Sequence, residues 1–296
     1  MNKLPLQTRV QILSMLCEGS SMRSISRVAD VSINTVSKLL IDAGKFCAQL
    51  HDDRVRNVRS HLVQCDEIWS FVGAKEKNVA SMKQPVDGAG DVWTWTALDS
   101  ESKLIISWLV GGRDSEYALA FMDDVKDRLA NRVQMTTDGH RAYLRAVEEA
   151  FGADIDYAML VKQYGEPEGK KASAERRYSP AVCTGAVKTR IEGSPDPAFV
   201  STSHVERSNL TMRMANRRFT RLTNAFSKKF DNHVHMIALY SVWYNFIKMH
   251  KTLRMTPAMS AGVTDKLWSM ADLVVMMDEV APKPGPRGPY KKRIAA

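Results

Sequence analysis

Three acidic residues far apart in the sequence have the type and setting of ligands for divalent metal ions. Asp66 lies within the apolar run "HLVQCDEIWSFV", Asp138 follows the run "RVQMTT", and Glu206 stands near the start of "SHVERSNLTMRMA". The first two are 72 residues apart and the last two are 68 residues apart. They therefore belong to separate elements, and only folding can bring them together.

Such a set of carboxylates is suited to metal-dependent phosphoryl transfer. Carboxylate oxygens are hard ligands that suit Mg²⁺ or Mn²⁺. Two convergent carboxylates repel each other unless a divalent ion offsets their charge, and two ions roughly 4 Å apart can stabilise both the attacking and the leaving oxygen. We expect Asp66, Asp138 and Glu206 to be catalytic and to hold two Mg²⁺ (or Mn²⁺) ions.

Other acids are weaker candidates for this site. Glu67 adjoins Asp66 on the same expected strand, so its side chain must leave the opposite face. Asp99 falls at a hairpin turn, where aspartate is common. Asp123 and Asp124 fit the solvated face of a helix.

The elements expected to position the three acids form an α/β domain. Strands are predicted over 61–72, 91–99, 103–112, 132–140 and 154–161, and helices over 115–130, with Ser115 as its cap, and 141–152. The short turn between the second and third strands predicts a hairpin. The order predicts a mixed five-stranded sheet flanked by helices. In such a sheet the first strand can lie beside the fourth, with Asp66 and Asp138 facing each other across neighbouring strands.

Three short helical patterns precede this domain. Ser21 and Ser32 are predicted N-caps of the second and third helices, with a tight turn at Asp30 between these helices. Such an arrangement is typical of a helix-turn-helix, in which the start of the second motif helix enters the major groove. A three-helix bundle that mediates protein contacts is the alternative. The residues expected to face inward are Ile25, Val28, Ala29, Val36, Leu39 and Leu40.

Polar and basic residues on these two helices have the chemistry of DNA contacts. Asparagine can bond adenine, serine and threonine can reach bases or phosphates, and lysine and arginine neutralise phosphates. The residues expected to bind DNA in this region are Arg23, Arg27, Asn34, Thr35, Ser37 and Lys38.

A second basic region follows Glu206. Seven basic residues and no acid occur between residues 207 and 229. Helical steps of three and four from Glu206 reach Asn209, Arg213 and Arg217 on one face. A basic face beside a metal site suits the phosphates that flank a scissile bond, and a surface helix with incidental charge is the alternative. The residues expected to bind DNA are Asn209, Arg213, Arg217, Arg218 and Arg221.

The composition agrees with a polyanionic partner. The 296 residues carry 42 Lys and Arg against 33 Asp and Glu, a formal net charge of +9. A basic enzyme without nucleic acid fits the charge alone equally well. The four cysteines are far apart, so no zinc site or disulfide framework is predicted. No apolar run reaches about eighteen residues, and we expect a soluble, intracellular protein without membrane contact.

The domain boundaries follow from these patterns. We predict a helix-turn-helix domain over 1–50, a linker over 51–61, and a catalytic core over 62–232 with a turn-rich insertion at about 164–202 that can hold one short strand. A helical region over 233–280 suits core or dimer packing. The Pro-, Gly- and Lys/Arg-rich tail over 281–296 is predicted to be disordered.

Four motifs occur in an order that resembles a known family over nearly the whole chain. After the helix-turn-helix come "CDEIWSFV", "TTDGHRAY", "STSHVERSNLTMRMANRRFTRLTNAFSKK" and "YNFIKMHKTLRMTPAMSAG". The chain thereby resembles the DDE transposases of the insertion-sequence-one family. The resemblance implies a ribonuclease-H-like core and maps the acidic triad onto Asp66, Asp138 and Glu206. Longer family members carry a cysteine-rich zinc-binding segment ahead of the helix-turn-helix, which this sequence lacks.

The function implied is DNA transposition. Water would attack a phosphodiester to free a 3′ hydroxyl, which would then attack target DNA at the same site. The implied partners are double-stranded DNA, as element ends and target, and further copies of the chain in a homodimer or higher oligomer. The implied location is the bacterial cytoplasm, at the nucleoid when the protein is bound to DNA. The alternatives are a catalytically inactive DNA-binding regulator derived from a transposase, and a structure-selective nuclease.

Overall fold

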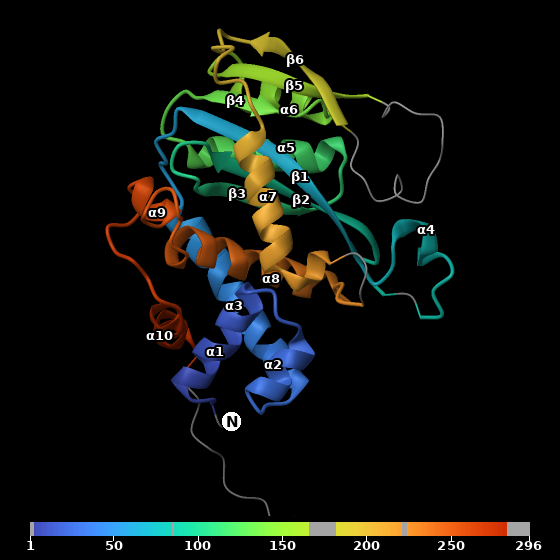
Figure 1. Cartoon of the computed structure of the whole chain (residues 1–296), viewed down its shortest axis with the longest axis vertical. Helices are drawn as coiled ribbons and strands as arrows, with labels where there is room; N and C mark the ends of the chain where they lie inside the picture. Colours follow the sequence, from blue (N-terminus) through green and yellow to red (C-terminus); the bar gives the residue numbers. More distant parts are fainter. Residues whose placement is uncertain (1–2, 85, 166–181, 221–223, 283–296) are drawn as a thin grey trace, which may run out of the picture.

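The computed structural model describes residues 3–84, 86–165, 182–220 and 224–282. Its strands are β1 (Leu62–Val72), β2 (Gly90–Asp99), β3 (Ile105–Gly111), β4 (Gln134–Thr137), β5 (Asp156–Gly165) and β6 (Val182–Glu192). Its helices are α1 (Leu6–Cys17), α2 (Met22–Val28), α3 (Ile33–Arg54), α4 (Glu76–Val79), α5 (Ser115–Arg128), α6 (Ala142–Phe151), α7 (Ser203–Ala215), the 3₁₀ helix η2 (Arg217–Phe219), α8 (Phe230–Val242), the π-helix η3 (Trp243–Ile247), α9 (Pro257–Ser260) and α10 (Met270–Val280). Figure 1 shows the sheet at one end of the molecule and the N-terminal helices at the other.

The strands form one mixed sheet in the order β3-β2-β1-β4-β5-β6. The pairs β1/β2, β2/β3 and β5/β6 are antiparallel, whereas β1/β4 and β4/β5 are parallel. The first strand thus lies beside the fourth, and the second and third strands form a hairpin, as the sequence predicts. The sheet has six strands and not the predicted five.

The sixth strand, β6, lies within the predicted insertion. It pairs with β5 along most of that strand's length and leaves its own outer edge unpaired among the described residues. Its described side chains are exposed apart from a half-buried Gly185. No buried face imposes an alternation of polar and apolar residues on this strand, which is why its sequence predicted only a short strand at most.

Helices cover both faces of the sheet (Figure 1). On one face lie α5 and α6, whose apolar residues include Phe121, Met122 and Tyr143, all fully buried. On the other face α7 crosses β1 and β2. The N-cap of α5 is Asp114, whose carboxylate accepts the backbone N–H of Glu116 and Tyr117, and not the predicted Ser115.

The three N-terminal helices have the predicted caps. Ser21 and Ser32 cap α2 and α3 with their hydroxyls, and Asp30, with φ of 49°, makes the turn between these helices. Of the residues predicted to face inward, Val28 is 59% exposed and was wrongly placed. Val28 is the last residue of the seven-residue α2, so its side chain has no later helical turn to shelter it.

A continuous core joins these helices to the C-terminal part of the chain. At the crossing of α3 and α8, a Cβ on Gly44 would lie 2.3 Å from the Cβ of His235, so only glycine allows this approach. The guanidinium of Arg9 on α1 donates to both carboxylate oxygens of Asp278 on α10, at 2.6 and 2.8 Å. Tertiary packing therefore extends across residue 50, where the sequence predicted a domain boundary.

Helix α3 also reaches the sheet domain. It continues into the predicted linker and ends at Arg54. Near its end, Asp52 accepts a hydrogen bond from Arg128 of α5 at 2.8 Å, and the buried ring of His51 lies 3.2 Å from the carbonyl oxygen of Ile105. One helix thus links the N-terminal turn to both β3 and α5.

Two further findings concern membrane-spanning segments and the C-terminal end of the described chain. No described helix is both long enough and apolar enough to span a bilayer. The predicted tail, apart from residues 281–282, lies outside the described residues.

Candidate active site

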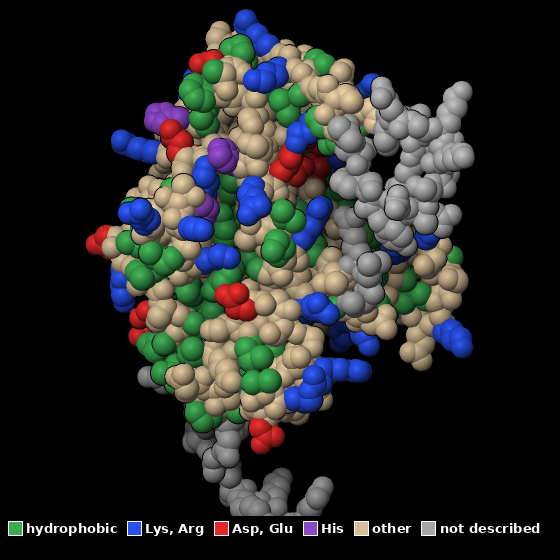
Figure 2. All heavy atoms as spheres, in the orientation of Figure 1, with side chains coloured by type: hydrophobic (Ala, Val, Ile, Leu, Met, Phe, Trp, Pro, Cys, Tyr) green, Lys and Arg blue, Asp and Glu red, His purple; other side chains and the backbone are tan. Residues whose placement is uncertain are grey.

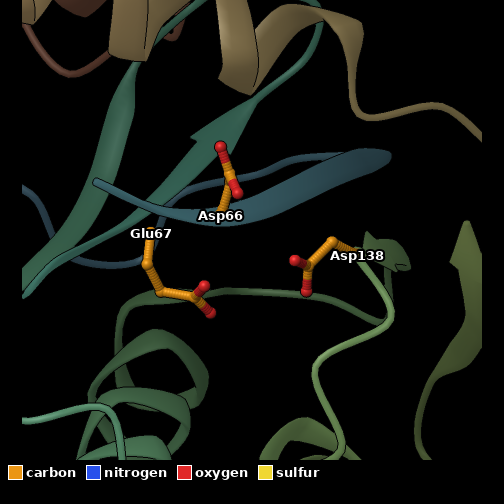
Figure 3. Close-up of side chains that lie close together, drawn as sticks. All are labelled: Asp66, Glu67 and Asp138. Carbon is orange, nitrogen blue, oxygen red and sulfur yellow. The ribbon is translucent and has the colours of Figure 1, made fainter. Parts of the chain in front are cut away.

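Asp66 and Asp138 meet where β1 and β4 run side by side. The parallel register pairs Cys65 with Thr137, and each acid is the next residue on its own chain segment. Together with Glu67 they form a group in which one oxygen from each carboxylate lies within 4.8 Å of the others. Figure 3 shows Asp66 and Glu67 leaving opposite sides of β1, with Asp138 beside them at the end of β4.

Glu67 is therefore closer to the site than the sequence indicated. Its side chain leaves the face opposite Asp66, as the pleat requires, but its carboxylate extends toward Asp138 (Figure 3). The residue is only 7% exposed, and its Oε1 is buried without a hydrogen-bond partner. Burial, followed by the charge of Asp138, raises the pKa of Glu67 to about 7.

Among the described residues, Arg113 is the cation that pairs with the carboxylates on this side of the cluster. Nη2 of Arg113 donates to Oε2 of Glu67 at 3.2 Å and lies 3.8 Å from Oδ2 of Asp138. The guanidinium stacks over the ring of Trp93, 4.5 Å from its centroid, which restricts its position. Sequence reasoning missed Arg113, because it follows β3 and its approach to the acids depends on the sheet order.

Asp66 is held from the opposite face by α7. Nδ2 of Asn209 donates to Oδ2 of Asp66 at 2.8 Å, and Asn209 is 3% exposed. Burial is the largest influence on Asp66 and raises its pKa to about 6, with the charges of Asp138 and Glu206 acting in the same direction against the Asn209 bond. Asn209, on the helix that carries Glu206, therefore points toward Asp66.

Helix α7 is anchored to the strand that carries Asp66. Oε1 of Gln64, a buried residue two positions before Asp66, accepts the backbone N–H of His204 at 2.9 Å and of Val205 at 3.1 Å. Residues two apart on a strand share a face, so Gln64 and Asp66 both address α7. A glutamine inside an apolar strand was the available signal for this contact.

Glu206 lies on α7 but outside the group of three close carboxylates. Its Oε1 accepts a hydrogen bond from Thr202 at 2.6 Å, and Nζ of Lys162 on β5 lies 2.5 Å from Oε1. Glu206 contributes to the raised pKa of Asp66, so the two charges interact. The structure brings Asp66 and Asp138 together and places Glu206 nearby in an ion pair.

Lys162 is the second residue that sequence reasoning missed. It follows the buried part of β5 and is half-buried. Burial is the strongest single influence on the pKa of Lys162 and lowers it, but the Glu206 carboxylate raises it, and the net pKa is raised. Polar residues after a buried strand segment are common, and only the packing of α7 over the sheet gives Lys162 its partner.

The residues predicted to bind DNA fall into separate groups. Arg23, Asn34 and Ser37 line a cavity that also contains Arg217 and Arg218. Arg27 and Lys38 are exposed on their helices, and the hydroxyl of Thr35 lies 3.0 Å from that of Ser32. Arg213 is exposed on α7, whereas Arg217 lies beyond the end of that helix, in η2, and so does not extend its face. Arg221 lies outside the described residues.

The surface around the site is mainly basic. Figure 2 shows a compact group of acidic side chains beside α7, at the level of the sheet, with Lys and Arg side chains around it on the same face. Such a distribution leaves a small negative centre inside a positive surface, which suits a polyanion held next to a cation site.

Comparisons with known proteins give only distant matches. No family model matches the chain, and no curated protein matches it. The solved structure titled "Mos1 transposase paired-end complex with left transposon end" has 13% identity and a TM-score of 0.21, covering 50% of this chain and 58% of its own. "Crystal structure of a pre-cleavage Mos1 transpososome" has 11% identity and 0.20, covering 53% and 60%. "Crystal structure of the Mos1 Strand Transfer Complex" has 14% identity and 0.21, covering 83% and 78%.

The chain thus spans less than two thirds of the first two of these structures. We base no inference on similarity at this level.

Proposed function

We propose that the protein is a DNA transposase that binds element ends and catalyses metal-dependent strand cleavage and strand transfer. The observation that carries this proposal is the convergence of Asp66 and Asp138 on adjacent parallel strands, beneath a helix that holds Glu206. The acids come from separate parts of the chain. Their approach costs free energy through desolvation and repulsion. A purely structural role gives no reason for that cost, whereas a bound cation would offset it.

The donor set fits a hard divalent cation. One oxygen of Asp66 lies within 4.8 Å of one oxygen of Asp138, and the charge of Glu206 also acts on Asp66. Burial raises the pKa of Asp66 to about 6, and the charges of Asp138 and Glu206 add to this effect. We infer that Asp66, Asp138 and Glu206 would hold two Mg²⁺ or Mn²⁺ ions. When bound, these ions stabilise charge on the attacking and leaving oxygens of the phosphodiester.

The protein's own residues have distinct parts in this proposal. Asn209 orients the carboxylate of Asp66 through its 2.8 Å hydrogen bond. Lys162 balances the charge of Glu206 and would have to release it before that carboxylate could take part. Arg213 and the other cations around the acidic group bind the phosphates on either side of the reacting bond. The three N-terminal helices would bind the element ends as a helix-turn-helix.

The finer assignment is to the insertion-sequence-one family, with a ribonuclease-H-like core. The support is the order of the four motifs in the sequence and the mixed sheet with a parallel β1/β4 pair. Because two DNA ends must be paired, we further propose a homodimer or higher oligomer. Inverted repeats bracketed by short direct repeats in the DNA flanking the gene would support the family, and flanks without them would oppose it.

The test is a strand-joining assay. Labelled duplexes from the two flanks of the gene are incubated with the full chain, a target plasmid and Mg²⁺, and joined products are separated from cut products. Joining is expected with Mg²⁺ and not in excess chelator. Asp138→Asn should abolish it, whereas Asp123→Asn, which alters an exposed acid on α5, should not. Joining by Asp138→Asn at the unaltered rate would refute the proposed ligand set.

One observation favours a second candidate. Glu206 is paired with Lys162 and lies outside the close carboxylate group, as it would in a DNA-binding regulator derived from a transposase and lacking activity. Such a regulator would bind the flanking DNA and neither cut nor join it. A structure-selective nuclease would cut without joining, so the same assay separates all three.

A further inference from the structure

A cavity lies between the N-terminal helices and the segment that follows α7. Its volume is about 770 Å³. One wall comes from the end of α1, the start of α2 and the start of α3, and the other from η2, residues 224–228 and α8. The two walls touch where the α1–α2 turn meets the end of α7, since a Cβ on Gly19 would lie 3.0 Å from the carbonyl oxygen of Met214. The cavity therefore joins both regions in which the sequence predicts DNA contacts.

The lining is positively charged. It includes four cationic side chains and four asparagines, and no acid among the described residues that form it. A cavity of this charge favours an anionic ligand over a neutral or cationic one. The charged residues are Arg23, Arg217, Arg218 and Lys228, and the asparagines are Asn34, Asn216, Asn224 and Asn232.

Asn216, in the wall of this cavity, has an unused hydrogen-bond donor. Its Oδ1 accepts the backbone N–H of Arg218 at 3.1 Å, which fixes the orientation of the amide group. Its Nδ2 is buried and has no partner among the described residues, and the residue is only 1% exposed. A buried donor without an acceptor costs free energy. An acceptor oxygen supplied by a ligand would remove that cost.

Arg218 adds a cation without a counter-charge. Its guanidinium donates to Oγ of Ser227 at 2.9 Å and lies 3.8 Å from Sδ of Met22, and no described carboxylate pairs with it. Burial lowers the pKa of Arg218 to about 10. The neighbouring His233 is kept neutral, because burial and then the charge of Arg218 lower its pKa to about 3. Arg218 thus has the properties of a residue that binds phosphate, because it carries a positive charge and several N–H donors in a partly buried position.

We propose that this cavity binds a phosphate of the DNA backbone, held by Arg218 and the Nδ2 of Asn216. The inference rests on the proposed function and deepens it, because it makes the N-terminal helices and η2 two walls of one DNA site. The cavity is larger than a phosphate, and the apolar side chains of Met22, Ile33 and Phe226 in its walls are suited to pack against deoxyribose.

The distance between the cavity and the carboxylates can be estimated from helix α7. Helix α7 carries Glu206 and ends next to Asn216, so ten residues of mostly helical chain separate the two. At about 1.5 Å per residue this is roughly 15 Å, or about four base pairs of duplex at 3.4 Å each. One continuous duplex can thus contact both sites.

The experiment measures DNA affinity against salt concentration for the full chain, with a fluorescein-labelled duplex of random sequence. Two variants alter the cavity with little change in shape. Arg218→Met removes the charge and keeps a long side chain. Asn216→Asp keeps the acceptor that holds η2 and replaces the unused donor with an acid, which repels a phosphate. Each should bind the duplex about tenfold more weakly, and Arg218→Met should reduce the slope of log K against log salt by about one.

The matched control is Arg145→Met, which makes the same charge change on α6, where Arg145 pairs with the exposed Glu149. It should leave affinity and slope unchanged. Thermal melting in the absence of DNA checks that both cavity variants remain folded, and each should melt in one cooperative transition well above the assay temperature.

Three outcomes separate the possibilities. Wild-type binding with weakened cavity variants supports the inference. Wild-type binding with unaltered variants overturns the inference and leaves the proposed function intact, including the case in which inorganic phosphate raises the melting temperature of the wild type but not of Asn216→Asp, which would make the cavity a site for a free phosphate compound. Failure of the wild type to bind any duplex overturns the proposed function and the inference together.

Discussion

Two consecutive acids on β1 have been given different surroundings by the two faces of the sheet. Asp66 faces α7 and accepts a hydrogen bond from the neutral amide of Asn209, with no cation paired to it among the described residues. Glu67 faces the α5 and α6 side and accepts from Arg113, a full charge fixed by stacking on Trp93. Burial raises the pKa of both acids.

The α7 side of the sheet thus has unneutralised negative charge that an added cation could balance, whereas the α5 and α6 side already has a cation in Arg113. On the α7 side, Lys162 is engaged with Glu206, and no described cation forms an ion pair with Asp66. On the other side Arg113 spans Glu67 and Asp138. We therefore expect a divalent ion to enter from the α7 side, and Glu67 to position Asp138 through Arg113.

The strongest test of this comparison is Asp66→Asn. The change keeps the shape and a partner for Asn209 and removes the charge. Loss of a metal ligand that stabilises the transition state by several kcal/mol should lower strand joining by about a thousandfold or more. The rate of joining under single-turnover conditions measures it. Activity within tenfold of the wild type would mean that Asp66 is not a ligand.

Glu67→Gln should have a much smaller effect. Arg113 would keep a hydrogen-bond acceptor at residue 67 but lose a charged partner there, so it would interact more strongly with Asp138. We expect a fall of about tenfold in the joining rate, since a positioning residue acts through the geometry of another. Rescue should follow in Glu67→Asp only if its shorter carboxylate still reaches Arg113. A loss as large as that of Asp66→Asn would make Glu67 a ligand and reverse the assignment of the two faces.

Lys162→Met tests whether the ion pair with Glu206 competes with metal binding. The pair is partly exposed, so its strength is limited to about 1 kcal/mol or less. Its removal should lower the Mg²⁺ concentration for half-maximal binding by about threefold, measured by calorimetric titration of the protein without DNA. Arg132→Met, which breaks an exposed ion pair with Asp156, is the matched control. Unchanged or weaker Mg²⁺ binding in Lys162→Met would show that the pair does not oppose the ion.

The smallest expected effect is on the pH dependence of stability without divalent ions. The folded-state pKa is about 6 for Asp66 and about 7 for Glu67, above their unfolded values, so the folded protein binds more protons between about pH 4 and pH 7. The penalty of charging these acids is absent below that window and complete above it. The contribution of these two acids to stability should therefore rise as the pH falls through it. His51 and His233, whose pKa values burial lowers to about 4 and about 3, act in the opposite direction.

The comparison needs a reference, because other carboxylates titrate too. Asp278, whose pKa is held at about 2 mainly by its bond to Arg9, loses its stabilising effect only at still lower pH. The melting temperature of Asp66→Asn/Glu67→Gln should exceed that of the wild type by a few degrees at about pH 7.5 and match it near pH 4.5. A constant difference would contradict the raised pKa values.

The sequence predicted the parts of the fold that depend on local pattern and chain order. The β2–β3 hairpin, the caps Ser21 and Ser32, and the neighbouring β1 and β4 all follow from alternation, turn chemistry and the order of elements. The exposed strand β6 does not, because no buried face imposes a period on its residues. The five-stranded prediction failed for that reason.

The candidate site divides in the same way. The meeting of Asp66 and Asp138 followed from the strand order, and the orientation of Asn209 from helical spacing. Lys162 and Arg113 could not be predicted, because each reaches the acids across elements whose packing the sequence does not specify. The ion pair of Glu206 is likewise a tertiary contact, and the role of the three acids as a triad stays a prediction.

Helix α3 runs without interruption from Ile33, directly after its N-cap Ser32, to Arg54, a span of 22 residues. At about 1.5 Å per residue it is roughly 33 Å long, close to one turn of B-form DNA at about 34–36 Å. Its first residues face the proposed DNA cavity and its last are bonded to β3 and α5. Because Gly44 packs closely against His235 and the last residues of α3 are bonded to β3 and α5, this helix fixes the position of the proposed DNA cavity relative to the sheet.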